Sequence, residues 1–251
     1  MSPQAVVKMA SLKCGLVHRL WARLCGKAAL TGYNHFLTRR GRDMSGMLGL
    51  VLPEGAIGIA RYAMALPNLV QMKQKPAKNV YSRAGTAIDE IVLHGTESHR
   101  PEAESADYIA SANDQGTSIH YWIGRTFGVL YAMVPEDKAA GHAGNPHKVA
   151  GVQDHNYRSI GIEMYQLDIS MFKGDKTKLD FTDWQYDTVA MLVYDICRRR
   201  HIRRSMVVAH HTINNVERAD PRNFDWDRFN RQIDRISQTL ASQLGPGFAL
   251  T

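Results

Sequence analysis

The fold is decided by the stretch Ile91-Val92-Leu93-His94-Gly95-Thr96, an apolar, strand-like run that ends in a histidine. The pattern returns downstream in Val207-Val208-Ala209-His210, and Asp220-Pro221 follows in a loop. Side chains at the ends of strands, or in the loops after them, can meet at one edge of a sheet. Three nitrogen or oxygen ligands with a fourth position left open are typical of a catalytic zinc site. We therefore predict that these two histidines and the aspartate bind zinc.

The alternative for the second histidine ligand is His211, which directly follows His210. Strand alternation would send the two side chains to opposite faces, so that only one can face the metal. A single histidine at a strand end is more often structural than a ligand. The prediction therefore depends on the three residues together.

Two further residues are candidates for catalysis. Glu163 ends the apolar run Ser159-Ile160-Gly161-Ile162, where a carboxylate is costly to bury without a function. We expect it to act as the general base for a zinc-activated water, and the alternative is a strand-end ion pair with an arginine. Arg218 lies two residues before Asp220, where a fixed cation would stabilise an oxyanion. Its alternative is a solvated loop arginine.

Small residues surround His142 in the segment Gly141-His142-Ala143-Gly144-Asn145. This composition is typical of close approach by a substrate or of a tight turn. We predict that His142 and Asn145 contact the substrate. His120, in Ser118-Ile119-His120-Tyr121, is expected only to support the site by hydrogen bonding.

From about Tyr81 onward, strand-like and helix-like segments alternate, which predicts an α/β fold with a mixed central sheet flanked by helices. We place this single domain at residues 76–245. Thr182 and Gln185 are spaced for a capping box at the start of a long helix. Strands are expected at 89–93, 120–123, 129–134, 159–164 and 206–209, and helices at 101–112, 182–200 and 225–244.

Residues 1–75 form an N-terminal extension that is rich in Lys and Arg and poor in acids. The segment from Lys73 to Lys78, at the end of this extension, is predicted to be a linker. Thr38-Arg39-Arg40 and Ala63-Met64-Ala65 look like parts of an export signal. The alternatives are an unprocessed, loosely ordered segment and a true start at Met44. We expect a bacterial cell-envelope location, periplasmic or secreted, or the cytoplasm if no export signal operates.

The composition is that of a globular protein, with 44% hydrophobic residues and a net charge of +7. A basic surface suits nucleic acid, anionic lipid or bacterial wall, or it serves solubility alone. No DNA-binding motif supports a nucleic-acid partner, and no apolar run is long enough for a membrane span. Cys14, Cys25 and Cys197 are too few and too scattered for a disulfide framework, and Cys197 is expected in the core.

Five motifs in order make the chain resemble the zinc-dependent N-acetylmuramoyl-L-alanine amidases of the type 2 group, relatives of peptidoglycan recognition proteins and phage lysozyme-like amidases. The resemblance covers roughly residues 75–240. The motifs are Ile91-Val92-Leu93-His94, Ser118-Ile119-His120-Tyr121, Gly141-His142-Ala143-Gly144, Ser159-Ile160-Gly161-Ile162-Glu163, and His210 through Asp220-Pro221 with Phe224-Asp225-Trp226.

The resemblance implies zinc on His94, His210 and Asp220, with Glu163 as in the bacterial recycling and cell-envelope members. The implied reaction is hydrolysis of the amide between N-acetylmuramic acid and L-alanine, in peptidoglycan or muropeptides, and we expect a monomer. One departure is Arg218, where many catalytic members have Lys. The alternative function is a non-catalytic peptidoglycan-binding recognition module, although such relatives tend to lose the metal ligands that this chain keeps.

Overall fold

The computed structural model describes residues 72–144, 155–167, 180–214 and 218–250. Residues 1–71 lie outside these ranges, and with them the segments that look like an export signal. Asn145, which we expected to contact the substrate, also lies outside the described residues.

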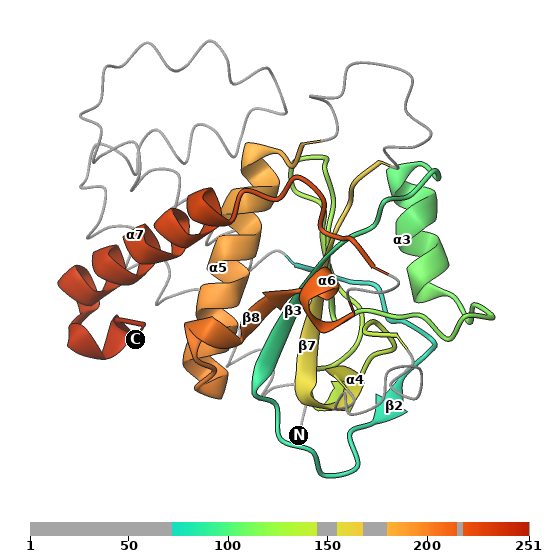
Figure 1. Cartoon of the computed structure of the whole chain (residues 1–251), viewed down its shortest axis with the longest axis horizontal. Helices are drawn as coiled ribbons and strands as arrows, with labels where there is room; N and C mark the ends of the chain where they lie inside the picture. Colours follow the sequence, from blue (N-terminus) through green and yellow to red (C-terminus); the bar gives the residue numbers. More distant parts are fainter. Residues whose placement is uncertain (1–71, 145–154, 168–179, 215–217, 251) are drawn as a thin grey trace, which may run out of the picture. The chain divides into compact units, whose positions relative to one another are not determined.

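A six-stranded mixed sheet occupies the centre of the described structure (Figure 1). Its order is β1 (Lys73–Gln74), β5 (Leu130–Ala132), β4 (Tyr121–Ile123), β7 (Ser159–Met164), β3 (Glu90–Gly95) and β8 (Val207–Ala209). β4 and β5 form an antiparallel hairpin, while β3 pairs in parallel with both β7 and β8. The α/β fold with a mixed sheet is therefore confirmed.

The two central strands, β3 and β7, are buried along their whole length. Parallel strands covered on both faces need nearly continuous apolar side chains, and Ile91, Ile160 and Ile162 supply them. His94 and Glu163 interrupt these runs near the carboxyl ends of the strands. In a sheet of this kind, that edge is where ligands bind.

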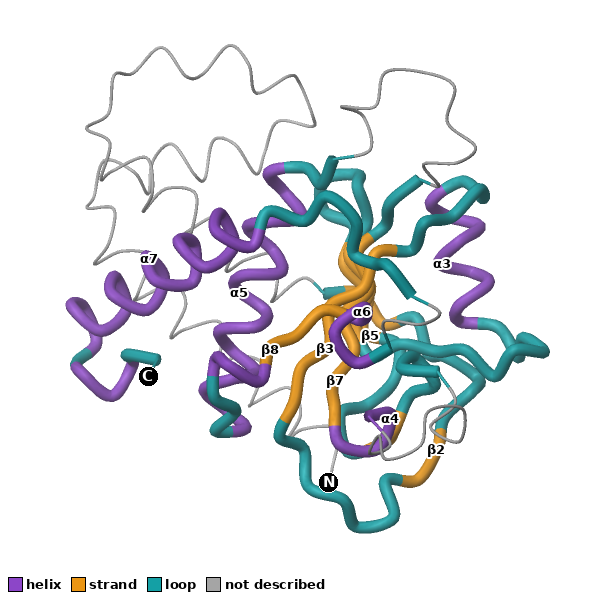
Figure 2. The backbone as a smooth tube through the Cα atoms, in the orientation of Figure 1, coloured by secondary structure: helices purple, strands orange, loops and turns teal. Residues whose placement is uncertain are grey.

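Helices lie on both sides of the strands in Figures 1 and 2. α5 (Asp183–Arg200) and α7 (Trp226–Leu244) pack against each other on one side, and α3 (Glu102–Ala110) lies on the other. Asp225 caps α7 by accepting a hydrogen bond from the Arg228 amide at 2.8 Å. The buried residues of this helix include Phe229, Ile233 and Ile236.

The long helix α5 begins with the predicted capping box. The Gln185 amide donates to Thr182 Oγ1 at 3.3 Å, and the Thr182 amide donates to Gln185 Oε1 at 3.0 Å. Cys197 is buried in the core on this helix and is a free thiol, as expected. None of the helices in the described part of the chain is long and apolar enough to cross a membrane.

The prediction of a linker at Lys73 to Lys78 is wrong, because this segment belongs to the sheet. Lys73 and Gln74 form β1, which pairs in parallel with β5. The pairing continues as the Lys75 amide donates to the Ala132 carbonyl at 3.0 Å and the Ala77 amide to the Met133 carbonyl at 2.9 Å. Charged residues are common on edge strands. The polar sequence of this segment therefore did not indicate a strand, because the strand is held by backbone hydrogen bonds.

His210 does not end a strand, because β8 ends at Ala209 and His210 begins the short helix α6 (His210–Ile213). The prediction that strand alternation turns the His210 and His211 side chains to opposite faces is therefore wrong. A helical rotation of about 100° per residue, and not strand alternation, turns the two side chains apart. The consequence still holds, since His210 is buried and His211 is exposed.

The remaining elements are short and were not predicted. They are the two-stranded antiparallel sheet of β2 (Tyr81–Ser82) and β6 (Lys138–Ala139), the helix α4 (His155–Arg158), and the 3-10 helices η4 (Arg204–Met206) and η5 (Pro246–Phe248).

Candidate metal site and active-site pocket

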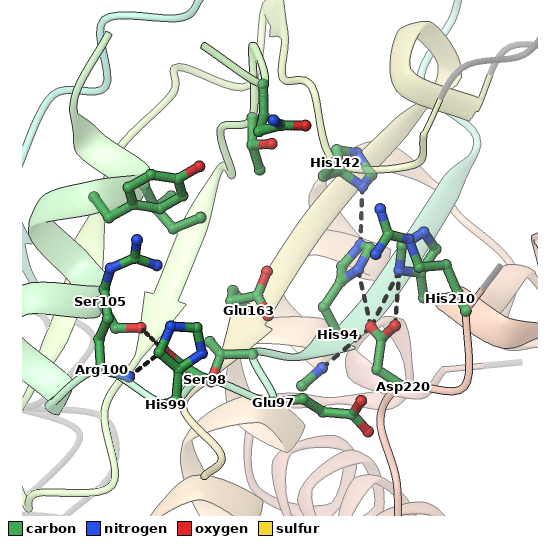
Figure 3. A pocket seen from close by; sticks show the side chains of 17 residues that line it. His94, Glu97, Ser98, His99, Arg100, Ser105, His142, Glu163, His210 and Asp220 are labelled. Atoms are coloured by element: carbon green, nitrogen blue, oxygen red, sulfur yellow. Dashed lines mark hydrogen bonds and ion pairs between the residues drawn. The ribbon is translucent and has the colours of Figure 1, made fainter. Parts of the chain in front are cut away.

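The three predicted metal ligands meet at the carboxyl end of β3 (Figure 3). Asp220 lies between the two histidines: its Oδ2 is 3.3 Å from His94 Nδ1, and its Oδ1 is 3.1 Å from His210 Nδ1. All three side chains are buried. One ligand atom from each residue lies within 4.8 Å of the others, so the group could hold a metal ion.

The donor set fits zinc. Tetrahedral coordination with bonds of about 2.0–2.1 Å places neighbouring ligand atoms roughly 3.3 Å apart. The two nitrogen–oxygen distances at Asp220, 3.3 and 3.1 Å, are close to this separation. Two imidazoles and one carboxylate are also ligands that zinc accepts readily. The distances and the kinds of donor atom in this cluster are therefore compatible with a zinc ion.

Electrostatics keep His94 and Asp220 in the forms that can bind a metal. Burial and the neighbouring His210 lower the pKa of His94 to about 4, so its ring is neutral at pH 7. Burial alone would raise the pKa of Asp220, but hydrogen bonds with His210 and His94 outweigh it and hold this pKa below its usual range. A neutral imidazole and an ionised carboxylate both present lone pairs to a cation.

The loop that carries Asp220 is fixed against β3. The Gly95 amide donates to Asp220 Oδ2 at 3.4 Å, and the His211 amide donates to the Asp220 carbonyl at 3.1 Å. A Cβ at position 95 would lie 2.7 Å from Gln166 Oε1 and 3.3 Å from Pro221 Cα. Glycine therefore lets the loop approach the strand closely enough to bring the carboxylate to the histidines.

His142 lies next to His94 and also lines the pocket. Its Nδ1 is 2.9 Å from His94 Nε2, and its Nε2 is 3.1 Å from Ser159 Oγ. A Cβ at Gly161 would come 2.7 Å from the His142 ring, so the glycine makes room for it. Burial and the neighbouring His94 lower the pKa of His142 well below its usual value. The sequence did not predict this contact with a metal ligand.

His120 lies directly before β4 and is buried near His142, with ring centroids 5.7 Å apart. The Gly161 amide donates to His120 Nδ1 at 3.0 Å, and His120 Nε2 lies 3.0 Å from the Lys138 carbonyl and 2.9 Å from Arg83 Nη2. Burial lowers the pKa of His120 to about 3. The ring is therefore neutral and occupied at both nitrogens.

Glu163 projects into the same pocket from β7, where it is the register partner of His94. It is 9% exposed, and burial followed by the nearby Asp220 raises its pKa well above the usual value, while Arg218 acts in the opposite sense. Among the described residues, no lysine or arginine forms an ion pair with it. A strand-end ion pair, the alternative to catalysis, is therefore not found in this part of the chain.

The pocket has a volume of about 450 Å³, within the range of small-molecule sites. The three metal-site residues, His142 and Glu163 line one part of it. Arg218 also lines it and is exposed; it lies close enough to Glu163 and His94 to lower the pKa of each.

The opposite wall was not foreseen from the sequence. It contains Arg100, in the loop after β3, which Figure 3 shows across the pocket from the histidines. Tyr108 from α3 and Thr117 from the segment before β4 also line the pocket. One feature of the sequence could have indicated this wall. Arg100 lies shortly after the carboxyl end of a parallel strand, where the loops that bind ligands gather.

Comparisons with known proteins agree with this geometry. The model of the family described as N-acetylmuramoyl-L-alanine amidase matches residues 84–223. Among solved structures, the chain is similar to a selenomethionine derivative of AmpD, with 25% identity and a TM-score of 0.52 over 65% of this chain and 94% of that one. No curated protein matches the chain.

Two further similar structures contain ligands. One is the amidase AmiD from E. coli in complex with a substrate, with 26% identity and a TM-score of 0.46 over 62% of this chain and 60% of that one. The other is AmpDh3 from Pseudomonas aeruginosa in complex with an anhydromuramic pentapeptide, with 22% identity and a TM-score of 0.47 over 62% of this chain and 68% of that one.

Proposed function

The chain belongs to the N-acetylmuramoyl-L-alanine amidase family, and from this premise we propose that it hydrolyses the amide between N-acetylmuramic acid and L-alanine with the help of zinc. The observation that carries the zinc proposal is the position of the Asp220 carboxylate between the two histidines. Its Oδ1 lies 3.1 Å from His210 Nδ1, and its Oδ2 lies 3.3 Å from His94 Nδ1. His94, His210 and Asp220 would hold the ion and leave one position open to the pocket. When bound, zinc would polarise the substrate carbonyl and lower the pKa of water to about 7.

Glu163 acts as the general base in this proposal. Its carboxylate reaches the pocket beside the ligand cluster and would take a proton from the attacking water. Burial raises its pKa, which brings the carboxylate closer to the range in which a base works best near neutral pH. The same carboxyl, once protonated, can return the proton to the departing nitrogen of L-alanine.

Arg218 stabilises the negative charge that develops on the carbonyl oxygen. It lines the pocket, and its charge reaches both Glu163 and His94. A guanidinium remains charged throughout, so it cannot act as an acid but can hold an oxyanion. Arginine in place of the lysine common in related enzymes keeps this role, although it loses the compact ammonium.

His142 positions the ring of His94. If His94 turns Nδ1 toward the metal, its Nε2–H donates to His142 Nδ1, and His142 Nε2–H in turn donates to Ser159 Oγ. Ser159 Oγ then donates to the His155 carbonyl. A hydrogen bond of this kind fixes the orientation of a ligand histidine and raises its basicity. Contact of His142 and Asn145 with the substrate remains a prediction.

The proposed substrate is peptidoglycan or a muropeptide released from it, bound by a monomer whose amidase domain extends the predicted range of residues 76–245 to include β1. We place its action in the bacterial cell envelope. A non-catalytic recognition module is the competing function. A buried Glu163 that forms no ion pair within the described ranges, beside three residues that could hold a metal ion, favours catalysis. Incubation with N-acetylmuramoyl-L-alanyl-D-γ-glutamate tests the proposal: hydrolysis releases a free L-alanine amino group, while binding without release would leave only the recognition function.

A further inference from the structure

We propose that Arg100 recognises the peptide half of the substrate by binding the α-carboxylate of a γ-linked D-glutamate in the second position of the stem. The enzyme would then select substrates in which this carboxylate is free and not amidated. The inference rests on the proposed amidase function and adds to it a specificity-determining residue on the wall of the pocket that faces the metal ligands.

The backbone of Arg100 is held on both sides. Its amide donates to Ser98 Oγ at 3.1 Å, and its carbonyl accepts a hydrogen bond from the Tyr165 hydroxyl at 2.8 Å. The guanidinium lies over the ring of Tyr108, with its central carbon 4.3 Å from the ring centroid. Such stacking holds the planar group in place at small entropic cost and leaves its N–H edges free. Arg100 is thus a fixed cation on the pocket wall (Figure 3).

This charge has no acidic partner among the described residues. Some other arginines there are paired, among them Arg158 with Asp89, Arg199 with Glu136, and Arg222 with Glu97, whose carboxylate lines the same pocket. Arg100 forms no such pair, although it is only partly exposed. A positioned guanidinium with free N–H donors in a pocket is suited to a carboxylate that binds through both oxygens.

The chemistry of the substrate indicates which carboxylate this is. In the intact substrate, the lactyl carboxyl of the muramic acid is consumed by the amide bond, so the sugar side of that bond carries no negative charge. On the peptide side, a D-glutamate linked through its γ-carboxyl leaves its α-carboxylate free, one residue beyond L-alanine. It is the first negative charge that the enzyme meets beyond the bond to be cleaved.

Arg218 does not fill this role, because it lies at the reacting centre. Its charge acts on both Glu163 and His94, whereas the Arg100 guanidinium is stacked on Tyr108 of α3. The pocket therefore has two cations in different places: one close to the proposed general base, and one on the wall opposite the metal ligands. The second fits a group one residue away from the scissile amide.

The test compares two substrates that differ in a single charge: N-acetylmuramoyl-L-alanyl-D-γ-glutamyl-L-lysine and the same compound with the α-carboxylate of its D-glutamate amidated to D-isoglutamine. The wild-type enzyme should have a KM for the acid about 10- to 100-fold lower than for the amide, the range expected for a charge-assisted hydrogen bond. Arg100→Gln should raise KM for the acid to nearly that for the amide and leave kcat almost unchanged. Arg100→Lys should keep part of the preference.

Arg203→Gln is the matched control, because Arg203 is exposed and lies outside the pocket; it should keep the full preference. Zinc content and Tm of each variant show whether it is folded, and the wild-type comparison needs no variant. Equal KM values for the two substrates with the wild-type enzyme, or an undiminished preference in Arg100→Gln, would overturn the role of Arg100 while leaving the amidase function intact. Cleavage of neither substrate would overturn the proposed function, and this inference with it.

Discussion

His94 and Glu163 are in-register partners on the neighbouring parallel strands β3 and β7. Register partners point to the same side of a sheet, and both side chains face the pocket in Figure 3. One backbone pairing therefore fixes the distance between a proposed metal ligand and the proposed general base. Because both strands are buried along their length, neither residue can shift without disturbing the core.

Glu163→Gln tests the general base. The amide is nearly isosteric but cannot take a proton, so the rate of muropeptide hydrolysis should fall by about 10²–10⁴ with zinc content unchanged. Asp227→Asn, an exposed carboxylate on α7, is the control and should hydrolyse the substrate at the wild-type rate. Near-normal turnover by the Glu163 variant with zinc bound would assign Glu163 a structural role only.

Arg218→Ala tests the oxyanion contact. Removal of one stabilising group of this kind should lower kcat by roughly 10- to 1000-fold with KM little changed, because the interaction forms mainly in the transition state. Arg218→Lys should restore most of the rate by returning a positive charge. A change in KM alone would place Arg218 in substrate binding, and no change in either constant would make it a surface arginine.

The structure also predicts a pH-dependent contribution from Glu136. Burial alone would raise its pKa, but hydrogen bonds from Arg199, Tyr121 and Arg200 outweigh this and lower the pKa to about 2 from an ordinary value of 4.5. A carboxyl whose pKa is lower in the folded state stabilises the fold above its unfolded pKa and loses this contribution as pH falls toward the folded value. Glu136→Gln should therefore reduce the free energy of unfolding at pH 7 by on the order of 2–3 kcal/mol.

Urea unfolding of wild type and Glu136→Gln at several pH values measures this difference. The gap between the two proteins should narrow steadily from about pH 4.5 to about pH 2, the two pKa values involved. A gap that stays constant over this range would show that the stabilisation does not come from the ionised carboxylate.

Truncation tests the finding that β1 belongs to the domain. A chain that begins at Leu66 keeps β1 and should fold and cleave muropeptide like the full chain. A chain that begins at Asn79 loses β1 and also Ala77, which is buried against the cluster that contains Trp122 and Met133. Its Tm should be lower by several degrees, as expected from losing about 1–3 kcal/mol of packing and hydrogen bonds. Equal Tm values would show that the segment adds nothing to stability.

The sequence predicts the elements whose pattern is long or chemically distinctive. Examples are the apolar runs of β3 and β7 and the capping box of α5. In each of them several neighbouring residues favour the same local structure, and the structure contains these elements at the expected positions. The metal cluster also follows from the sequence, since residues at strand ends converge once the sheet is assumed.

The sequence does not predict elements that depend on partners far along the chain. β1 is two residues long and polar, and only its pairing with β5 makes it a strand. The pocket wall at Arg100 and Tyr108 forms because β3, α3 and the segment before β4 are brought together, and no local periodicity marks it. The link from His142 to His94 likewise joins residues far apart in the sequence.

Zinc content and muropeptide cleavage, measured on the same preparations of wild type, His210→Ala and His211→Ala, test the central claim most directly. His210 contacts Asp220 in the buried cluster, whereas its neighbour His211 is exposed. The wild-type enzyme and His211→Ala should each hold about one zinc per chain and release L-alanyl peptide, and a chelator should abolish the reaction until zinc is added back. His210→Ala should lose most of both the metal and the activity. Full activity in metal-free wild-type enzyme, or zinc retained by His210→Ala and lost by His211→Ala, would contradict the account.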